Sequence, residues 1–159
     1  MSEEVPATDD RDPAEVVTEM VAHVLELAST WTAWDGRPIP AEDRVYTPHK
    51  AIRRVGDHLI DHLAELDARL AGVPPLADYW HASYSTTPAD MAPFTEKDLD
   101  EARSRLERLA QIWAVRLNSL SRDQLLHSPG TGWTFQQLAF HIAGSSYYAN
   151  AVGRLTPAG

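Results

Sequence analysis

Residues 47–72 read TPHKAIRRVGDHLIDHLAELDARLAG. The threonine and proline that open this segment favour a helix start, because the threonine side chain caps free backbone N–H groups and proline fits the first helical position. Apolar residues then recur at helical spacing as far as Gly72, after which Pro74 and Pro75 stop the pattern. These residues are Ile52, Val55, Leu59, Leu63, Leu66 and Leu70. The segment therefore predicts a long amphipathic helix.

Two histidines lie on the apolar side of this helix. His58 and His62 are four residues apart, so both point along the stripe that Val55, Leu59 and Leu66 form. Imidazole among apolar side chains is unusual enough to mark both residues as candidate metal ligands. Asp57 and Asp61 are their sequence neighbours but point away from the stripe.

Working outward, three further helices are predicted from the same signals. Asp12-Pro13 begins a helix that runs to Trp34, Thr95 caps one that reaches Leu120, and Thr134 caps one that ends near Gly153. Nothing alternates with period two over a useful length, so no strand is expected. The predicted fold class is all-α, a four-helix bundle with a long loop between its second and third helices.

That loop, residues 73–94, contains four prolines and an aromatic group. Loops this long in compact domains are usually functional or cover an opening, so the segment is a candidate lid. Its aromatic and histidine residues are Tyr79, Trp80, His81 and Tyr84. The remaining boundaries are an acidic tail at 1–11, expected to be disordered, the bundle at 12–153 and a short tail at 154–159.

Composition excludes several classes of function. There is no cysteine, so disulfides, thiolate metal sites and cysteine nucleophiles are ruled out. A formal charge of -9 disfavours nucleic acid as a partner, and no apolar run is long enough to suggest a membrane helix. The acidic start does not resemble a secretory signal, so a cytoplasmic protein is expected. Nearly all basic residues are arginine, as in the GC-rich genomes of actinobacteria.

A third histidine strengthens the metal hypothesis. His141 lies on the inward face of the last predicted helix, together with Leu138, Ser145, Tyr148 and Val152. Three neutral imidazoles suit zinc, nickel or iron, and three protein ligands are typical of catalytic zinc. The alternative is that these histidines are hydrogen-bonded core residues without a metal.

The other histidines favour the plainer interpretation. A single histidine on an apolar face is more often a core or boundary residue than a ligand, and this applies to His23 and His127. His49 begins a helix and is expected to be exposed. His81 lies in the candidate lid, where an ordinary loop residue is the more common case.

Two segments also carry a family resemblance. Residues 47–72 and the segment GWTFQQLAFHIAGSSYYANAV, residues 132–152, resemble the histidine-bearing helices of the DinB/YfiT-like superfamily. That resemblance implies a four-helix bundle with a divalent metal held by a histidine of the second helix and an HxxxH pair, or a variant of it, on the last. Members include thiol S-transferases that use bacillithiol or mycothiol and a mycothiol-dependent maleylpyruvate isomerase.

By position, His58 matches the second-helix ligand and His141 the first histidine of the last-helix pair. The second histidine of that pair is replaced by Ser145. Either His62 supplies the third imidazole or the site has lost its affinity for metal. The first alternative implies a metal-dependent transferase or isomerase with a low-molecular-weight thiol as cofactor.

Two readings without catalysis remain. One is a small-molecule-binding or stress-response bundle without a working metal site. The other is a structural homodimer, in which Trp31, Trp34 and Trp113 supply apolar contact surface.

Overall fold

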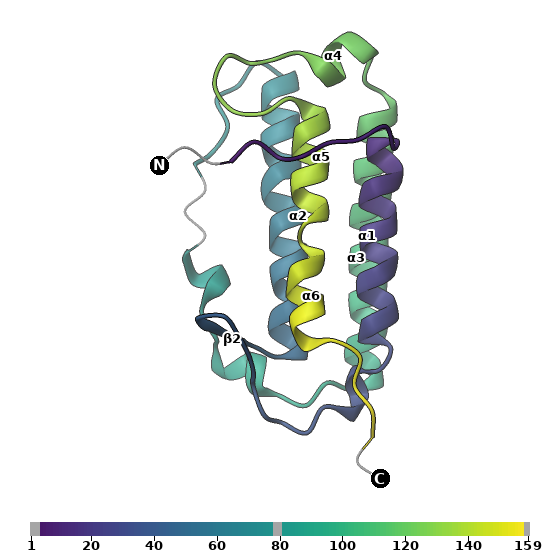
Figure 1. Cartoon of the computed structure of the whole chain (residues 1–159), viewed down its shortest axis with the longest axis vertical. Helices are drawn as coiled ribbons and strands as arrows, with labels where there is room; N and C mark the ends of the chain where they lie inside the picture. The colour runs from purple at the N-terminus through teal and green to yellow at the C-terminus, as the bar shows by residue number, and fades with distance from the viewer. Residues whose placement is uncertain (1–3, 78–80, 158–159) are drawn as a thin grey trace.

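The computed structural model describes residues 4–77 and 81–157, and this part of the chain is mostly helical. Its α-helices are α1 (Pro13–Ala28), α2 (Pro48–Leu70), α3 (Glu96–Asn118), α4 (Arg122–Leu126), α5 (Phe135–Ala143) and α6 (Ser146–Val152). Helices α1, α2 and α3 lie side by side with a fourth rod that α5 and α6 form together (Figure 1). The predicted helical character is confirmed.

The long connection between α2 and α3 sets the direction of the helices. It carries the chain from one end of the bundle back to the other, so α2 and α3 run parallel, whereas α1 and the α5–α6 rod run the opposite way (Figure 1). A bundle with one such crossover is a known variant of the four-helix arrangement. The α5–α6 rod therefore packs antiparallel to α2.

The predicted helix starts are all present. Asp12, Thr47, Thr95 and Thr134 each accept a hydrogen bond from a backbone N–H in the first turn of the helix that follows. Thr95 and Thr134 form complete capping boxes, because the residue three positions later also bonds back to the cap. These caps satisfy N–H groups that have no partner inside the helix.

Two predicted helices, the first and the third, end earlier than expected, and the last is interrupted. The first ends at Ala28 rather than Trp34, because the hydroxyls of Ser29 and Thr30 donate to the carbonyls of Glu26 and Leu27 and the chain turns. A short 3-10 helix at Trp31–Ala33 follows. The last helix is interrupted after Ala143, where N–H groups bond three residues back instead of four. The third ends at Asn118, before Leu120.

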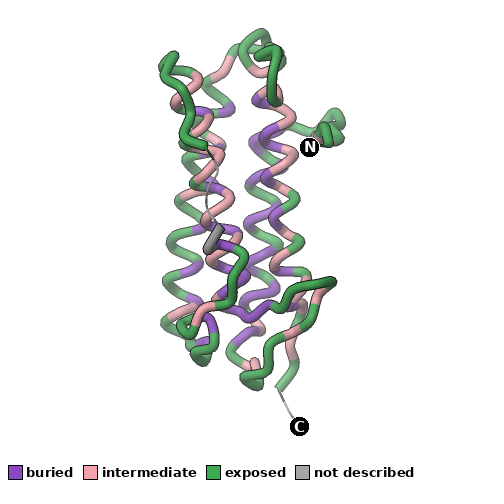
Figure 2. Tube along the Cα trace, turned by 90° about the vertical axis from the view of Figure 1, so that its left-hand side faces the viewer, coloured by how far each residue is buried: buried purple, intermediate pink, exposed green. Residues whose placement is uncertain are grey.

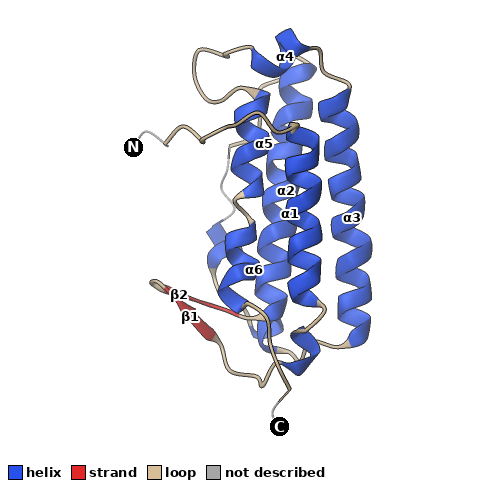
Figure 3. Cartoon of the chain, turned by 45° about the vertical axis from the view of Figure 1, so that its right-hand side comes forward, coloured by secondary structure: helices blue, strands red, loops and turns tan. Residues whose placement is uncertain are grey.

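The expectation that the chain has no strands is wrong. Strands β1 (Ile39–Ala41) and β2 (Arg44–Tyr46) form a small antiparallel hairpin, which lies beside α6 (Figure 3). Glu42 takes a φ of 57° in its two-residue turn, a conformation that glycine or asparagine usually supplies. Because neither glycine nor asparagine is present at this position, the sequence did not predict the turn. Helix α4 was not predicted either.

The core lies on the faces that the helices turn toward one another (Figure 2). Helix α1 buries ten of its residues and contacts both α3 and the α5–α6 rod. Trp31 and Trp113 are completely buried, and their indole N–H groups donate to the carbonyls of Gly153 and Leu59. Neither tryptophan can supply the contact surface of a dimer, so that prediction is wrong for both.

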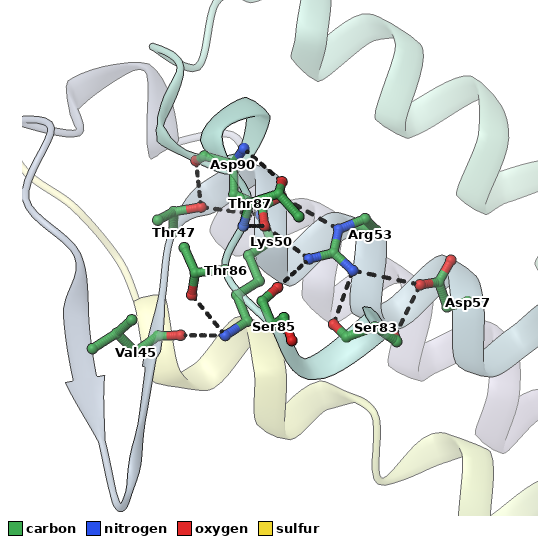
Figure 4. A network of polar contacts seen from close by, with 10 residues as sticks. All are labelled: Val45, Thr47, Lys50, Arg53, Asp57, Ser83, Ser85, Thr86, Thr87 and Asp90. Atoms are coloured by element: carbon green, nitrogen blue, oxygen red, sulfur yellow. Dashed lines mark hydrogen bonds and ion pairs between the residues drawn. The ribbon is translucent and has the colours of Figure 1, made fainter. Parts of the chain in front are cut away.

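Part of the candidate lid is fastened to α2 (Figure 4). Short 3-10 helices at His81–Tyr84 and Pro88–Met91 lie against it. Arg53 donates to the carbonyls of Ser83 and Ser85 and pairs at 2.8 Å with Asp90. Buried Lys50 donates to Thr86 in the same segment. The middle of the predicted lid, Tyr79 and Trp80, lies outside the described residues.

Replacing Arg53 should therefore destabilise the fold. Asp90 is only 4% exposed, so Arg53→Met leaves a buried carboxylate without its partner, and we expect a loss of about 2–3 kcal/mol in the free energy of unfolding. Urea unfolding measures it. Arg105→Met removes an exposed pair with Glu101 and should change stability by less than about 0.5 kcal/mol. Equal losses in both variants would contradict this account.

Candidate metal centre

Three histidines meet where α2 faces the end of α5. His58 and His62 come from successive turns of α2, and His141 comes from the last turn of α5. The ring centroids lie 4.7 Å apart for His58 and His141, 4.8 Å for His58 and His62, and 4.9 Å for His62 and His141. One nitrogen from each ring can be chosen so that all three lie within 4.8 Å of one another. The sequence-predicted set is therefore brought together.

Hydrogen bonds orient two of the three rings. His58 Nδ1 lies 2.5 Å from the hydroxyl oxygen of Ser145, and His62 Nδ1 lies 3.0 Å from a carboxylate oxygen of Glu65. Each contact engages the nitrogen on one side of the ring and leaves Nε2 for another partner. A second bond of this kind is the usual way in which proteins fix the ring and tautomer of a metal-ligating histidine.

Two of the histidines also contact each other through their Nε2 atoms. His58 Nε2 and His141 Nε2 lie 3.0 Å apart, so one of them carries a proton and donates it to the other. The imidazoles are thus satisfied by one another without a cation. Binding a cation through both nitrogens requires that proton to leave, and the Ser145 hydroxyl can accept from His58 Nδ1 in the resulting tautomer.

A polar pair and an aromatic ring border the triad. Glu65 accepts a hydrogen bond from Arg69 at 3.1 Å as well as lying against His62, and the contact with His62 is the main reason that the pKa of Glu65 is lowered. The indole of Trp133 lies 4.4 Å from the ring of His141. These neighbours hold the carboxylate charged and limit the positions open to the His141 ring.

The site keeps His58 and His141 neutral. Burial is the main reason that the pKa of His58 falls to about 3, and charge on its histidine neighbours and on Arg54 lowers it further. Burial likewise lowers the pKa of His141 to about 4, with charge on His62 acting in the same direction. Neutral imidazole is the form that ligates metals.

Ser145 has a different role from the histidine that the family pattern places there. It is 1% exposed, it lies at the break between α5 and α6, and its hydroxyl meets His58 rather than joining the triad. His62, from α2, is the third imidazole of the cluster. A third imidazole in this place is what the first of the two alternatives drawn from the sequence requires.

The other histidines lie elsewhere. His23 is exposed and bonded to Asn150, and His127 is exposed, so neither is the core or boundary residue that was expected. His49 was predicted to be exposed but is partly buried, because its Nε2 lies 3.0 Å from the Pro93 carbonyl. The side chain of His81 is outside the described part of the structure.

Several neighbours of the triad were missed. The sequence placed Asp57 and Asp61 next to the histidines but pointing away from their stripe; in the structure Asp57 accepts from Ser83, and Asp61 Oδ2 lies 3.9 Å from His62 Nε2. Glu65 is the carboxylate that bonds a histidine, and its spacing of three residues from His62 was the available signal. Nothing local announced Trp133, because it precedes α5 and reaches His141 only through the fold.

An open cavity of about 800 Å³ lies between the end of α2 and the α4–α5 connection, and His58, His62 and His141 are not among its lining residues. Arg69, Phe135 and His127 line it, and the Arg69 guanidinium lies 4.2 Å from the Phe135 ring centroid. Arg69 also bonds Glu65, which bonds His62. Hydrogen bonds from Arg69 to Glu65 and between Glu65 and His62 therefore connect the cavity wall to the triad.

No family model, curated protein or solved structure matches this chain. In the described residues, no helix has the length and apolar character needed to cross a membrane.

The lowered histidine pKa values predict how stability depends on pH. Unfolded histidine titrates near 6.5, whereas folded His58 and His141 do so at about 3 and 4, so below pH 6.5 the unfolded chain takes up protons that the folded chain does not. Metal-free protein should lose stability as pH falls from 6.5 to 5, before most carboxylates titrate. Urea unfolding across that range in chelator measures the slope.

Replacing His58 and His141 together tests whether these two residues cause the loss of stability at low pH. His58→Asn with His141→Asn should flatten the slope, whereas His23→Asn on exposed α1 surface should leave it as it is. An unchanged slope in the double variant would show that other groups cause the loss.

Proposed function

We propose that the protein is a metal-dependent enzyme of the DinB/YfiT-like type, with His58, His62 and His141 as the ligands of a divalent cation such as zinc, nickel or iron. One observation carries the proposal. Ligand nitrogens from all three histidines, contributed by two helices, gather within 4.8 Å of one another in a partly buried seam. The helical architecture and the two histidine-bearing segments agree with the family resemblance.

The residues fit a cation of this kind. All three donors are imidazoles, which suit zinc, nickel and iron better than calcium or magnesium. The pKa values of His58 and His141 keep both rings uncharged in neutral solution. Ser145 and Glu65 hold two of the rings by Nδ1, which is the arrangement expected of outer partners. Three protein ligands leave room for a small molecule.

The reaction proposed is transfer of a low-molecular-weight thiol to an electrophile, or an isomerisation that the thiol assists. A bound cation would supply a Lewis acid that lowers the pKa of the thiol. In transfer, the sulfur–carbon bond forms as the carbon–leaving-group bond breaks, and the thiol proton goes to solvent. The chain contributes neutral, oriented imidazoles and, through Trp133, an apolar wall on the His141 ring.

A second candidate is a non-catalytic small-molecule-binding bundle. The 3.0 Å contact between His58 Nε2 and His141 Nε2 favours it, since the two rings satisfy each other without a cation. The cavity of about 800 Å³ beside Arg69 offers a place for an apolar or anionic ligand. Stabilisation by such a ligand without any effect of metal would support this candidate over the enzyme.

Metal content decides between them. Tag-free protein reconstituted with zinc, nickel or iron and then dialysed should hold close to one ion per chain by elemental analysis. His58→Ala, His62→Ala and His141→Ala should each lower retained metal at least about tenfold, because two imidazoles bind far more weakly than three.

His23→Ala is the matched control, since it removes an exposed histidine that bonds only Asn150 among the described residues. It should retain wild-type metal. Protein that retains no metal after reconstitution would exclude the enzyme proposed here. Protein that retains metal but consumes no thiol with 1-chloro-2,4-dinitrobenzene or other electrophiles would exclude the transferase and leave a metal-binding bundle.

Ser145 should tune the affinity of the site rather than create it. Ser145→Ala removes the hydroxyl that orients His58, so metal affinity should fall roughly 10-fold, the low end of the effect of losing an outer partner. Competition with a chromophoric chelator measures it. Ser146→Ala changes the adjacent serine, which is not part of the described hydrogen bonds to the triad, and should leave the affinity unchanged.

A further inference from the structure

Arg54 lies one helical turn before His58 on α2, on the side of the triad away from Glu65. Its Nη2 donates to the hydroxyl of Tyr148 at 2.9 Å, and its guanidinium carbon lies 4.5 Å from the centroid of that ring. Tyr148 comes from α6, three residues after Ser145, and its ring centroid is 6.5 Å from that of His58. Arg54 and Tyr148 thus border the histidine triad next to His58.

The charge of Arg54 has no anionic partner among the described residues. Partly buried Arg53 and Arg69 have carboxylates at 2.8 and 3.1 Å, whereas Arg54 has none within 4.0 Å in the described part of the chain. In the same part of the chain, its Nε is the buried side-chain nitrogen that lacks a hydrogen-bond partner. A partly buried guanidinium in this state carries a cost that an anionic oxygen would remove.

The electrostatics of the triad point the same way. A divalent cation held by the triad would add two positive charges next to Arg54, which lies one helical turn from His58. Glu65 is the carboxylate in hydrogen-bond contact with the triad, and Arg69 already shares it. The site as a whole therefore favours a ligand that brings negative charge, and a single charge is enough to balance Arg54.

We propose that Arg54, supported by Tyr148, binds the carboxylate of a small thiol whose sulfur is presented at the histidine triad. This inference rests on the proposed function. Residues four apart on a helix are about 6 Å from one another, so a carboxylate one or two carbons from the sulfur spans the interval between the triad and Arg54. Arginine suits this role because its planar guanidinium can donate hydrogen bonds to both oxygens of a carboxylate.

Cobalt-substituted protein provides the test. Thiolate binding to cobalt gives a near-ultraviolet absorption band, and the proton of the thiol goes to the buffer. Thioglycolate carries a carboxylate, and 2-mercaptoethanol has a hydroxyl in its place. We expect wild-type protein to bind thioglycolate about 10-fold more tightly than 2-mercaptoethanol, as for one charge-assisted contact. In Arg54→Met the ratio should fall to about 1, and Arg54→Lys should restore part of it.

The measured quantity is the ratio of the two thiol affinities in each protein. A general change in the site affects both affinities and cancels in this ratio, and comparing the ratio between variants removes the intrinsic difference between the two thiols. Arg108→Met makes the same change in net charge on the exposed side of α3, and its ratio should equal that of wild type. Cobalt binding by Arg54→Met, read from its visible spectrum, shows that the triad is intact. If Arg54→Met does not fold, Arg54→Lys and Tyr148→Phe, which removes only the supporting hydroxyl, should each reduce the ratio.

The outcomes separate the two proposals. Wild-type protein that binds no cobalt overturns the proposed function and this inference with it. Cobalt binding with a wild-type ratio near 1, or with a ratio that the Arg54 variants leave unchanged, overturns the carboxylate site alone.

Discussion

Burial of α1 is the constraint on which the rest of the molecule depends. Ten of its residues are buried, more than in any other described helix, and it contacts both α3 and the α5–α6 rod. It contributes nothing to the candidate site. Because α1 secures the bundle, the seam between α2 and the α5–α6 rod can carry histidines, a glutamate and arginines in place of some of the apolar packing there.

The seam is organised along the axis of α2. Arg54 lies at one end, the histidines in the middle, and Glu65 with Arg69 at the other end. The carboxylate end is internally balanced, whereas the Arg54 end is not. A reacting molecule that enters this seam therefore meets a different charge on each side of the triad, and this asymmetry would fix its orientation.

Signals that belong to a single segment predicted the structure well. Capping residues such as Thr47 and Thr134 located the helix starts, and the periodic apolar faces placed His58, His62 and His141 on inward surfaces. What failed depended on other segments or on weak local chemistry. The hairpin turn at Glu42 has no glycine, Ser29 and Thr30 ended α1 by bonding back to its carbonyls, and Trp133 reaches His141 only after folding.

The distance in sequence between His58 and His141 has a consequence for the chain as a polymer. The two residues are 83 positions apart, yet their Nε2 atoms lie 3.0 Å from one another. A cation ligated by both would be a cross-link that closes this loop, in a chain that has no cysteine for a disulfide. Loop-entropy arguments for a disulfide of that span give about 4–5 kcal/mol. The proposed metal ion would then also stabilise the fold by cross-linking α2 to α5.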